Sequence, residues 1–397
     1  ALAHIQEAES FGIEVTGYAA SLAKVQERKA KIVDTLRNGI LTLLRKNKVE
    51  YVNGLGRLDG PHVVVVQTAD GQRRLEADAI ILATGSEPAR LKGFDFDQPT
   101  VMTSTEALNL SEPPKSMLIV GAGAIGCEFA CIYSALGSKI TMVEMMEQIL
   151  PLEDKRLAGY LGQSLTKRGI RILTKTVVDT ITEYTPTSVT AKLTNGETLT
   201  VDKILVSIGR SPNTRGIGLP EAGVALNERG YIVVDKQMRT SVPGVYAVGD
   251  CNGGILLAHV ASAEGICAAE NIYGANQEMD YSVVPSCIYT LPEVASVGLT
   301  VDKATAAGIE TATGRFSFGA LGKALAIGEG IGFVQLVADK QTDRLLGAQI
   351  FGPHATDLIQ EIAVAVRNGL TARQVGDTIH AHPTLSEAIM EAAHGVH

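Results

Sequence analysis

The sequence has no long hydrophobic run and no concentration of charge of one sign. No stretch of its 397 residues stays apolar over eighteen positions, which is about the minimum for a helix that crosses a bilayer. The net charge is −8, and the sequence contains no basic tract, whereas nucleic-acid-binding domains present clustered Lys and Arg. We therefore expect neither a membrane span nor a nucleic-acid partner.

Cysteine is also scarce. The five cysteines form an odd set without the spacing of a disulfide framework, which predicts a reducing, cytoplasmic compartment. Cys127 and Cys131 lie four positions apart on a predicted helix, so they are either a functional pair or, as we favour, two small packing residues. We expect no metal site. The cysteines are Cys127, Cys131, Cys251, Cys267 and Cys287.

The most informative stretch that is present ends on Glu144. An apolar strand leads into Gly121-x-Gly123-x-x-Gly126, and a helix and a second strand follow. The three glycines allow a tight turn, close approach of a pyrophosphate and close packing of the helix, whose N-terminus attracts phosphate. At the end of the second strand, an acid accepts hydrogen bonds from ribose hydroxyls and repels a 2′-phosphate. The pattern predicts an NAD site rather than an NADP site; the alternative is a glycine turn without a ligand.

The chain also contains an internal repeat. Asp78-Ala-Ile-Ile-Leu-Ala-Thr-Gly85 matches Asp202-Lys-Ile-Leu-Val-Ser-Ile-Gly209, and each copy follows a predicted meander with a tight glycine turn. Gly121 lies 88 residues before Gly209, and the same step back from Gly85 falls before residue 1. We therefore expect that the first copy had an upstream glycine motif of its own and that the chain is truncated.

Other segments outline the remaining architecture. Residues 18–48 predict a long amphipathic helix whose apolar face packs in the core. Short strands are predicted at 50–52, 63–67 and 79–82. From about residue 281 onward, mixed strands and helices predict an α+β segment without a glycine motif.

Asp250 ends a further apolar strand, in the sequence Tyr-Ala-Val-Gly-Asp. An acid at the carboxyl end of a strand lies where α/β sheets bind ligands. The alternative is that Asp250 caps a helix that starts near Leu256. The residues alone leave both readings open.

Taken together, the motifs resemble those of the disulfide-reducing flavoenzymes, and within them the dihydrolipoamide dehydrogenases, over essentially the whole chain. The resemblance implies an α/β fold with two Rossmann-like dinucleotide-binding domains, the first incomplete, and a C-terminal α+β dimerisation domain. The implied parts are 1–105 (remainder of the FAD-binding domain), 106–212 (NAD-binding domain), 213–281 (returning FAD or central segment) and 282–397 (interface domain). The motifs that carry it are ATGSEP, GAGAIGCE, SIGRSPNT, YAVGD, LLAH and HAHPTLSEA.

The resemblance also implies the cofactors FAD and NAD and a homodimer. Glu128 resembles the acid beside the contact of flavin and nicotinamide, and Asp250 resembles the residue that holds the ribityl chain. Implied NAD contacts are Gly121, Ala122, Gly123, Ala124, Ile125, Gly126, Cys127, Glu128, Glu144, Val177 and Gly209. Implied FAD contacts are Gly56, Thr84, Gly85, Ser86, Asp250, Leu256, Leu257, Ala258 and His259.

His382 resembles the catalytic base of that family, and Glu387 resembles the carboxylate that orients it. A dithiol must lose a proton before it attacks a disulfide, because the thiolate is the nucleophile. A histidine titrates near neutrality, and a carboxylate that fixes its tautomer makes it a better base. The alternative is structural, since Thr384-x-x-Glu387 is a capping box. His380 is expected to be a neighbour rather than the base.

The sequence departs from the family in one respect. The redox-active cysteine pair, with four residues between its members, and the first FAD motif are absent from the 397 residues, so we expect a truncated chain with little activity of its own. The implied parent activity passes electrons from protein-bound dihydrolipoamide through a disulfide and FAD to NAD⁺. Implied partners are lipoyl-bearing acyltransferases or a glycine-cleavage carrier, and the sequence leaves open which complex is served. Alternatives are a glutathione- or mercuric-reductase-like flavoprotein and a non-catalytic NAD-binding dimeric fragment.

Overall fold

The computed structural model describes residues 2–397, which form two compact units. The first unit contains residues 2–22, 90–208 and 282–397, and the second contains residues 23–89 and 209–281. The chain therefore leaves and re-enters both units. In this part of the chain, no helix is both long and apolar enough to cross a membrane.

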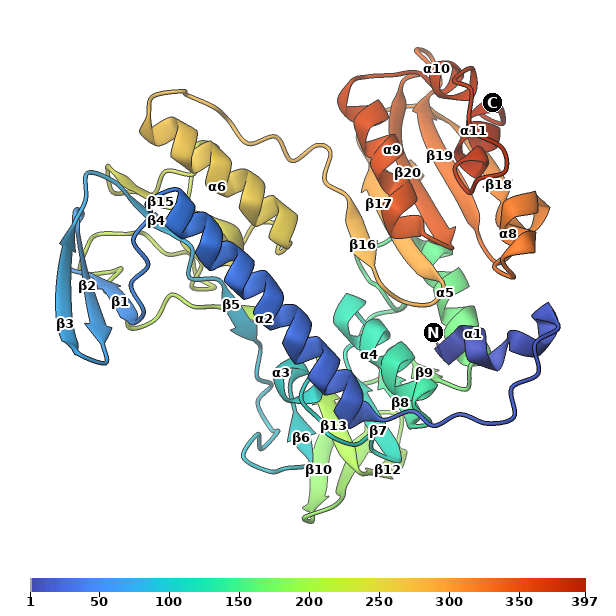
Figure 1. The fold of residues 1–397 in the computed structure, drawn as a ribbon, viewed down its shortest axis with the longest axis horizontal. Helices are drawn as coiled ribbons and strands as arrows, with labels where there is room; N and C mark the ends of the chain where they lie inside the picture. Colours follow the sequence, from blue (N-terminus) through green and yellow to red (C-terminus); the bar gives the residue numbers. More distant parts are fainter. Residues whose placement is uncertain (1) are drawn as a thin grey trace. The chain divides into compact units, whose positions relative to one another are not determined.

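A five-stranded parallel sheet in the order β6-β13-β7-β8-β9 forms one core of the first unit. Both faces of β7 are buried, because Met117 and Ile119 enter one apolar cluster while Leu118 and Val120 enter another. Burial on both faces is typical of parallel sheets, and α4 lies beside β7 and β8 in Figure 1. The elements are β6 (Val101–Met102), β7 (Ser116–Val120), α4 (Ala124–Ala135), β8 (Lys139–Val143), α5 (Lys155–Lys167), β9 (Arg171–Leu173) and β13 (Lys203–Val206).

An antiparallel meander, β10-β11-β12, separates β9 from β13. Gly196, in the predicted Asn195-Gly196 turn, has a φ of +92° and connects β11 to β12. The inward side chains of the meander pack with Leu118 and Val120 and so cover one face of the parallel sheet. The strands are β10 (Val178–Tyr184), β11 (Val189–Leu193) and β12 (Thr198–Val201).

The C-terminal part of the first unit is an antiparallel five-stranded sheet in the order β16-β17-β20-β19-β18. The helices α9 and α11 pack on it and share its apolar core (Figure 1). This confirms the predicted α+β segment. Its strands are β16 (Ser286–Ile288), β17 (Glu293–Gly298), β18 (Thr311–Ser317), β19 (Phe333–Asp339) and β20 (Leu345–Gly352), and its main helices are α9 (Ala355–Arg367) and α11 (Glu387–His394).

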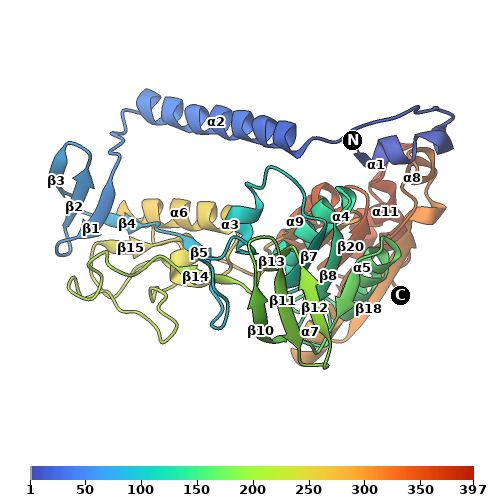
Figure 2. The ribbon, with the colours of Figure 1, turned by 90° about the horizontal axis from the view of Figure 1, so that it is seen from below.

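The second unit, like the part of the first unit that contains β6 to β13, combines a three-stranded meander with parallel strands. A meander, β1-β2-β3, precedes β4, which pairs in parallel with β15, and α6 lies over both strands in Figures 1 and 2. The elements are α2 (Leu22–Lys46), β1 (Leu55–Leu58), β2 (Val63–Thr68), β3 (Gly71–Glu76), β4 (Ile80–Leu82), β5 (Ser86–Pro88), β14 (Arg210–Pro212), β15 (Val245–Ala247), η2 (Gly249–Asn252) and α6 (Ala258–Ile272).

The internal repeat therefore has a structural counterpart. Each copy follows a three-stranded meander and ends in a glycine with positive φ, which is +69° at Gly85 and +122° at Gly209. The strands that follow these two glycines, β5 and β14, pair with each other, with Ser86 opposite Pro212 and Pro88 opposite Arg210. The two copies thus meet in a two-stranded sheet.

Short helical elements complete the description. Thr103 caps α3 in a capping box with Glu106, and Thr371 caps α10 in the same way with Gln374. The remaining elements are α1 (Leu2–Gln6), η1 (Ala8–Phe11), α3 (Ser104–Ala107), α7 (Val301–Ala306), η3 (Phe318–Ala320), α8 (Gly322–Ala326) and α10 (Ala372–Gly376).

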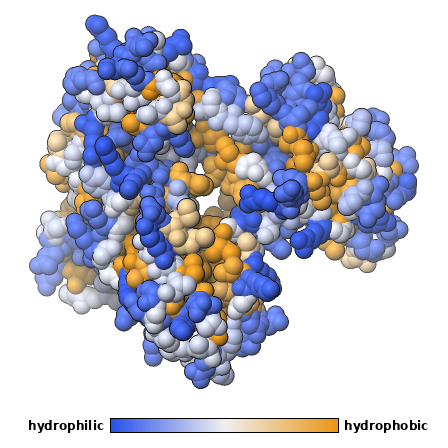
Figure 3. Space-filling view, turned by 180° about the vertical axis from the view of Figure 1, so that it is seen from behind, coloured by the Kyte–Doolittle hydropathy of each residue, from blue (hydrophilic) through white to orange (hydrophobic). Residues whose placement is uncertain are grey.

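Two expectations from the sequence are wrong. Residues 50–52 form no strand, because the partner strand β2 pairs instead with Leu55–Leu58. The long helix α2 forms as expected (Figure 2), but its apolar face is exposed rather than packed in the core. Hydrophobic residues are also visible elsewhere on the surface in Figure 3. The exposed side chains on α2 include Val25, Ile32, Leu36, Ile40 and Leu43.

Candidate functional site

The turn between β7 and α4 needs glycine at two positions for space. A Cβ on Gly126 would lie 2.1 Å from the carbonyl oxygen of Gly121, and a Cβ on Gly121 would lie 2.6 Å from that of Ser207. Gly121 also has a φ of +96°, which other residues rarely adopt. These two glycines therefore serve the close packing of the turn, the helix and the neighbouring strand.

Gly123 differs from the other two glycines of the motif. It is the N-cap of α4, and no atom lies within 4 Å of a Cβ built on it. The space is therefore open directly in front of the helix N-terminus, where free N–H groups and the helix dipole favour a phosphate. This opening fits the predicted close approach of a dinucleotide.

Glu144 lies directly after β8, next to this turn. Only 7% of the residue is exposed. Its Oε2 accepts a hydrogen bond from the N–H of Ala122 at 2.8 Å, and its Oε1 accepts one from Met146 at 2.9 Å. An ionised carboxylate can accept about four hydrogen bonds, so Glu144 holds the glycine turn and retains capacity for ribose hydroxyls.

The cysteines near this turn are packing residues. Cys127 is buried in the core, and Cys131 packs against the same cluster. Burial raises the pKa of both thiols, which makes them poor nucleophiles because the thiolate is the reactive form. All five cysteines are free in the described chain, and the favoured packing reading of Cys127 and Cys131 is confirmed.

The other predicted NAD contacts are distributed around the turn. Ala122 is buried, and Ala124, Ile125 and Glu128 lie in the first half of α4. Glu128 accepts a hydrogen bond from the Tyr289 N–H at 2.9 Å, and burial raises the pKa of its carboxyl group. Val177 is exposed just before β10. Gly209, by contrast, belongs to the second unit.

The second unit contains every residue predicted to contact FAD. Ser86 donates a short hydrogen bond to Oδ2 of Asp250. Arg210 donates to both Oγ and the carbonyl oxygen of Ser86, at 2.6 and 2.7 Å, and its Nε lies 3.4 Å from Oδ2 of Asp250. The structure therefore brings Ser86 and Asp250 together.

Arg210 was not singled out by the sequence analysis, although the repeat points to it. It follows Gly209 just as Ser86 follows Gly85, so the two residues occupy the same position in the two copies. Pairing of β5 with β14 then places them close to each other. Matching the repeat one residue further would have found the contact.

Asp250 does not cap a helix, so the alternative reading of this residue is wrong. It lies inside the short 3-10 helix η2, and the N-cap of α6 is Leu257, which makes no side-chain capping bond. The predicted segment 256–259 therefore enters the uncapped N-terminus of a 15-residue helix. Such an end attracts an anionic group.

Thr84 also fits a bound polar ligand. Its Oγ1 atom is buried without a hydrogen-bond partner among the described residues, a state that carries a desolvation penalty. Asn213, from the second repeat copy, donates from its backbone and side chain to the carbonyl oxygens of Gly85 and Thr84, both at 3.0 Å. The turn is therefore fixed while the hydroxyl is left available.

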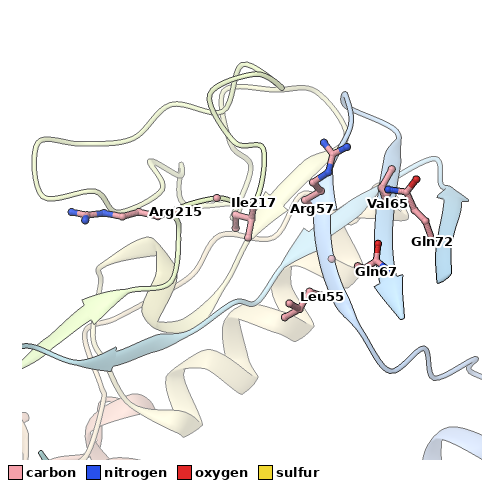
Figure 4. A pocket seen from close by; sticks show the side chains of 9 residues that line it. Leu55, Arg57, Val65, Gln67, Gln72, Arg215 and Ile217 are labelled. Carbon is pink, nitrogen blue, oxygen red and sulfur yellow. The ribbon is translucent and has the colours of Figure 1, made fainter. Parts of the chain in front are cut away.

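Gly56 lines a cavity of about 380 Å³ next to β1, a size that is common for ligand sites. In Figure 4, Leu55 and Ile217 lie between β1 and the 215–217 segment, whereas the guanidinium groups of Arg57 and Arg215 point in different directions. In this arrangement the two arginines do not clamp one anion. The lining residues are Leu55, Gly56, Arg57, Val65, Gln67, Gln72, Arg215, Gly216 and Ile217.

The predicted catalytic pair is formed in the structure. Nδ1 of His382 lies 2.8 Å from Oε1 of Glu387, and Oε2 of Glu387 accepts the Thr384 N–H at 2.8 Å. The His382 side chain is 80% exposed, so its Nε2 edge is accessible. The Thr384 N–H and then His382 lower the pKa of Glu387, which keeps this carboxylate ionised.

His380, two residues earlier, is enclosed on both sides. Its Nδ1 lies 2.8 Å from the carbonyl oxygen of Thr378, and its Nε2 lies 2.8 Å from Oε1 of Glu361 on α9. Its side chain is only 6% exposed. Burial alone would lower its pKa, but these two acceptors raise it overall. With both nitrogens occupied, His380 is poorly suited to accept a proton from a substrate.

Comparison with known proteins gives a consistent family match. A model of the pyridine nucleotide-disulphide oxidoreductases matches residues 4–265, and a model of their dimerisation domain matches residues 284–393. The chain is 43% identical to the dihydrolipoyl dehydrogenase of Chlamydia muridarum over 395 residues, which cover 99% of this chain and 84% of that protein. It is also 43% identical to that of Bacillus subtilis over 402 residues, with 98% and 85% covered.

A solved structure agrees with these matches. The crystal structure of LpdA from Mycobacterium tuberculosis superimposes with a TM-score of 0.92 at 29% identity, and covers 99% of this chain and 86% of that one. The similarity therefore extends over the α/β part and the C-terminal α+β part alike.

Proposed function

Because the chain belongs to the pyridine nucleotide-disulphide oxidoreductases, and within them to the dihydrolipoyl dehydrogenases, we propose that it oxidises protein-bound dihydrolipoamide with NAD⁺ as the electron acceptor. The observation that supports this most directly is the accessible His382 imidazole, held by Glu387 at 2.8 Å. The open N-terminus of α4 beside Glu144 supports NAD as the nucleotide.

His382 acts as the proton acceptor. Glu387 accepts the Nδ1–H, which leaves Nε2 unprotonated on the exposed edge of the ring. A substrate thiol passes its proton to Nε2, and the resulting thiolate would attack the redox-active disulfide that the resemblance implies and that these 397 residues do not supply; a new S–S bond forms as the S–S bond of that disulfide breaks and releases a thiolate. The ionised Glu387 then stabilises the imidazolium, since the two opposite charges are in direct contact.

The flavin contacts are proposed in the second unit. The chemistry that FAD supplies when bound is two-electron transfer between a disulfide and nicotinamide. Ser86, Asp250 and the Thr84 hydroxyl would hold its polar groups, and the uncapped start of α6 would face its anionic part. Gly56 would contact it from the cavity beside β1.

The nucleotide contacts are proposed in the first unit. Gly123 and the N-terminus of α4 would hold the pyrophosphate of NAD, and Glu144 would accept from the ribose. Ala122, Ala124, Ile125, Cys127, Glu128 and Val177 would line the same site. Gly209, which belongs to the second unit, stays a predicted NAD contact. The predicted division into parts at residues 105, 212 and 281 is kept as part of this proposal.

The chain contains a dimerisation domain, residues 284–393, and His382 and Glu387 both lie in it. We therefore propose a homodimer in which the catalytic pair is carried by the interface part of the chain. The lipoyl group would be supplied by an acyltransferase or a glycine-cleavage carrier, in the cytoplasm.

A direct assay tests the proposal. Because the redox-active cysteine pair is absent from these 397 residues, we expect them to form little NADH from dihydrolipoamide by themselves. In a form that carries the pair, we expect NADH formation from dihydrolipoamide and NAD⁺, faster after incubation with FAD, and little formation from NADP⁺. Reduction of glutathione disulfide or mercuric ion in preference to lipoamide would favour one of the other disulfide-reducing flavoproteins. Binding of NAD⁺ without any flavin absorbance or turnover would instead indicate a non-catalytic scaffold.

A further inference from the structure

Glu264 is a buried carboxylate that the proposed reaction does not use. It lies on α6, and only 1% of the residue is exposed. Its Oε2 accepts hydrogen bonds from the Gly249 N–H at 2.6 Å and from the Asn252 side chain at 2.9 Å. Its Oε1 accepts one from the Tyr281 hydroxyl at 2.6 Å. A carboxylate removed from water needs such donors.

Two of these donors belong to the turn that carries Asp250. Gly249 directly precedes Asp250, has a φ of +72°, and would place a Cβ only 3.0 Å from the Cβ of Ala261 on α6. Asn252 ends the same turn. One carboxylate on α6 therefore holds η2 at its first and last residues.

The same carboxylate is connected to the second predicted flavin segment. The side-chain oxygen of Asn252 accepts the Gly254 N–H at 2.9 Å, two residues before Leu256. Glu264 also lies less than two turns after His259 on α6. The Asp250 turn and the 256–259 segment thus converge on a single side chain.

Tyr281 is the third residue that donates a hydrogen bond to Glu264. It is the last residue of the second unit and precedes the segment that leads to the dimerisation domain. Burial, followed by the hydrogen bond to Glu264, raises the pKa of Tyr281. Its hydroxyl therefore stays protonated and remains a donor at neutral pH.

We propose that Glu264 is a positioning residue for the flavin site, which fixes Asp250 relative to the N-terminus of α6 before the cofactor binds. The assignment rests on the proposed function. A site whose two arms are fixed in advance loses less conformational entropy on binding. Removal of the carboxylate should therefore weaken FAD binding even when the fold is intact.

The test uses the full chain after removal of flavin, with FAD titrated by its fluorescence change and the melting temperature of the apoprotein measured in parallel. We expect Glu264→Ala to raise the Kd for FAD about tenfold or more, because several hydrogen bonds that fix the turn are lost. Glu264→Gln should stay within about threefold, since its amide oxygen can still accept from Gly249 and Asn252.

Glu153→Ala is the matched control. Glu153 accepts hydrogen bonds from Ser286 and Ser296 at 2.8 and 2.7 Å, but it lies in the first unit. We expect it to lower the melting temperature without a change in the Kd for FAD. An unchanged Kd in Glu264→Ala, with only a lower melting temperature, would overturn the positioning role.

Two further outcomes keep the test decisive. If Glu264→Ala does not fold, Asn252→Ala removes the hydrogen bonds of this side chain to Glu264 and Gly254, and should still raise the Kd several-fold; an unchanged Kd there overturns the proposal. If the unsubstituted chain binds no FAD at all, the flavin part of the proposed function fails, and the positioning role fails with it.

Discussion

Nδ1 of His382 lies 2.8 Å from Oε1 of Glu387, whose second oxygen accepts the Thr384 N–H at the same distance. The carboxylate therefore pairs with the histidine and also accepts a hydrogen bond from the turn before α11. The predicted capping box is wrong, because the N-cap of α11 is Ser386 rather than Thr384 and makes no side-chain capping bond. Because two contacts fix the carboxylate, it holds the imidazole in one orientation and one tautomer.

The role of His382 predicts a selective kinetic defect. In a form that carries the redox-active cysteine pair, His382→Gln should lower lipoamide turnover by about 10²-fold or more, because the proton acceptor is lost. Reduction of bound flavin by NADH should be preserved, since it needs no thiol deprotonation. Steady-state and stopped-flow absorbance measure the two separately.

His354→Gln is the matched control for that prediction. His354 is another exposed histidine whose Nδ1 faces a carboxylate, that of Asp357, at 3.4 Å. Its replacement should leave both rates unchanged. An equal loss of turnover and flavin reduction in His382→Gln would instead show that His382 has a structural role.

His380 predicts a pH-dependent contribution to stability. Its pKa is raised in the folded chain, so the His380–Glu361 pair stabilises fully below the unfolded value of about 6.5. That contribution is lost as the pH rises through the folded pKa. The melting-temperature deficit of His380→Gln should therefore be larger at pH 6 than at pH 9. A deficit that is equal at both pH values would contradict an ionic role for the pair.

The β7–α4–β8 unit could be predicted because its determinants are local. The glycine spacing, the apolar strand and the terminal acid all lie within about 30 residues, and each acts on its immediate neighbours. The apolar face of α2 could not be interpreted in the same way. Amphipathic periodicity identifies one face of a helix but does not say what, if anything, covers that face.

The prediction of site residues from the sequence is limited in the same way. The pairing of His382 with Glu387, which the resemblance implied, joins residues five positions apart, whereas the partner of His380 is Glu361, 19 residues away on another helix. Strand pairing at residues 55–58 was also missed, because register depends on the partner strand β2. Contacts set by tertiary packing are not encoded in a local pattern.

Glu144 predicts the nucleotide preference. Glu144→Ala should weaken NAD⁺ binding by about 1–3 kcal/mol, because a buried acceptor of ribose hydroxyls is lost, and should affect NADP⁺ less. Calorimetric titration with both nucleotides measures this difference. Glu147→Ala, which removes an exposed acid paired with Lys175, should change neither affinity. Equal losses for NAD⁺ and NADP⁺ would show that Glu144 only supports the glycine turn.

The glycine turn allows packing and ligand binding to be separated. Gly126→Ala should destabilise the fold by about 1–3 kcal/mol or more, because its Cβ would lie 2.1 Å from the Gly121 carbonyl oxygen. Gly123→Ala should leave the melting temperature nearly unchanged, since nothing lies within 4 Å of the added Cβ. It should nevertheless weaken NAD⁺ binding at least tenfold, because the methyl group occupies the space through which a pyrophosphate approaches the N-terminus of α4.

The comparison of these two variants tests the turn as a binding site, because a turn used only for packing would show a different pattern. In that case Gly126→Ala would still destabilise the fold, but Gly123→Ala would have no effect on either measurement. A Gly123→Ala variant with normal stability and normal NAD⁺ affinity would therefore rule out binding of the pyrophosphate at the N-terminus of α4. A variant with normal stability and lost affinity would place it there, since no side chain or backbone atom beyond the adjacent residues lies within 4 Å of the new methyl group.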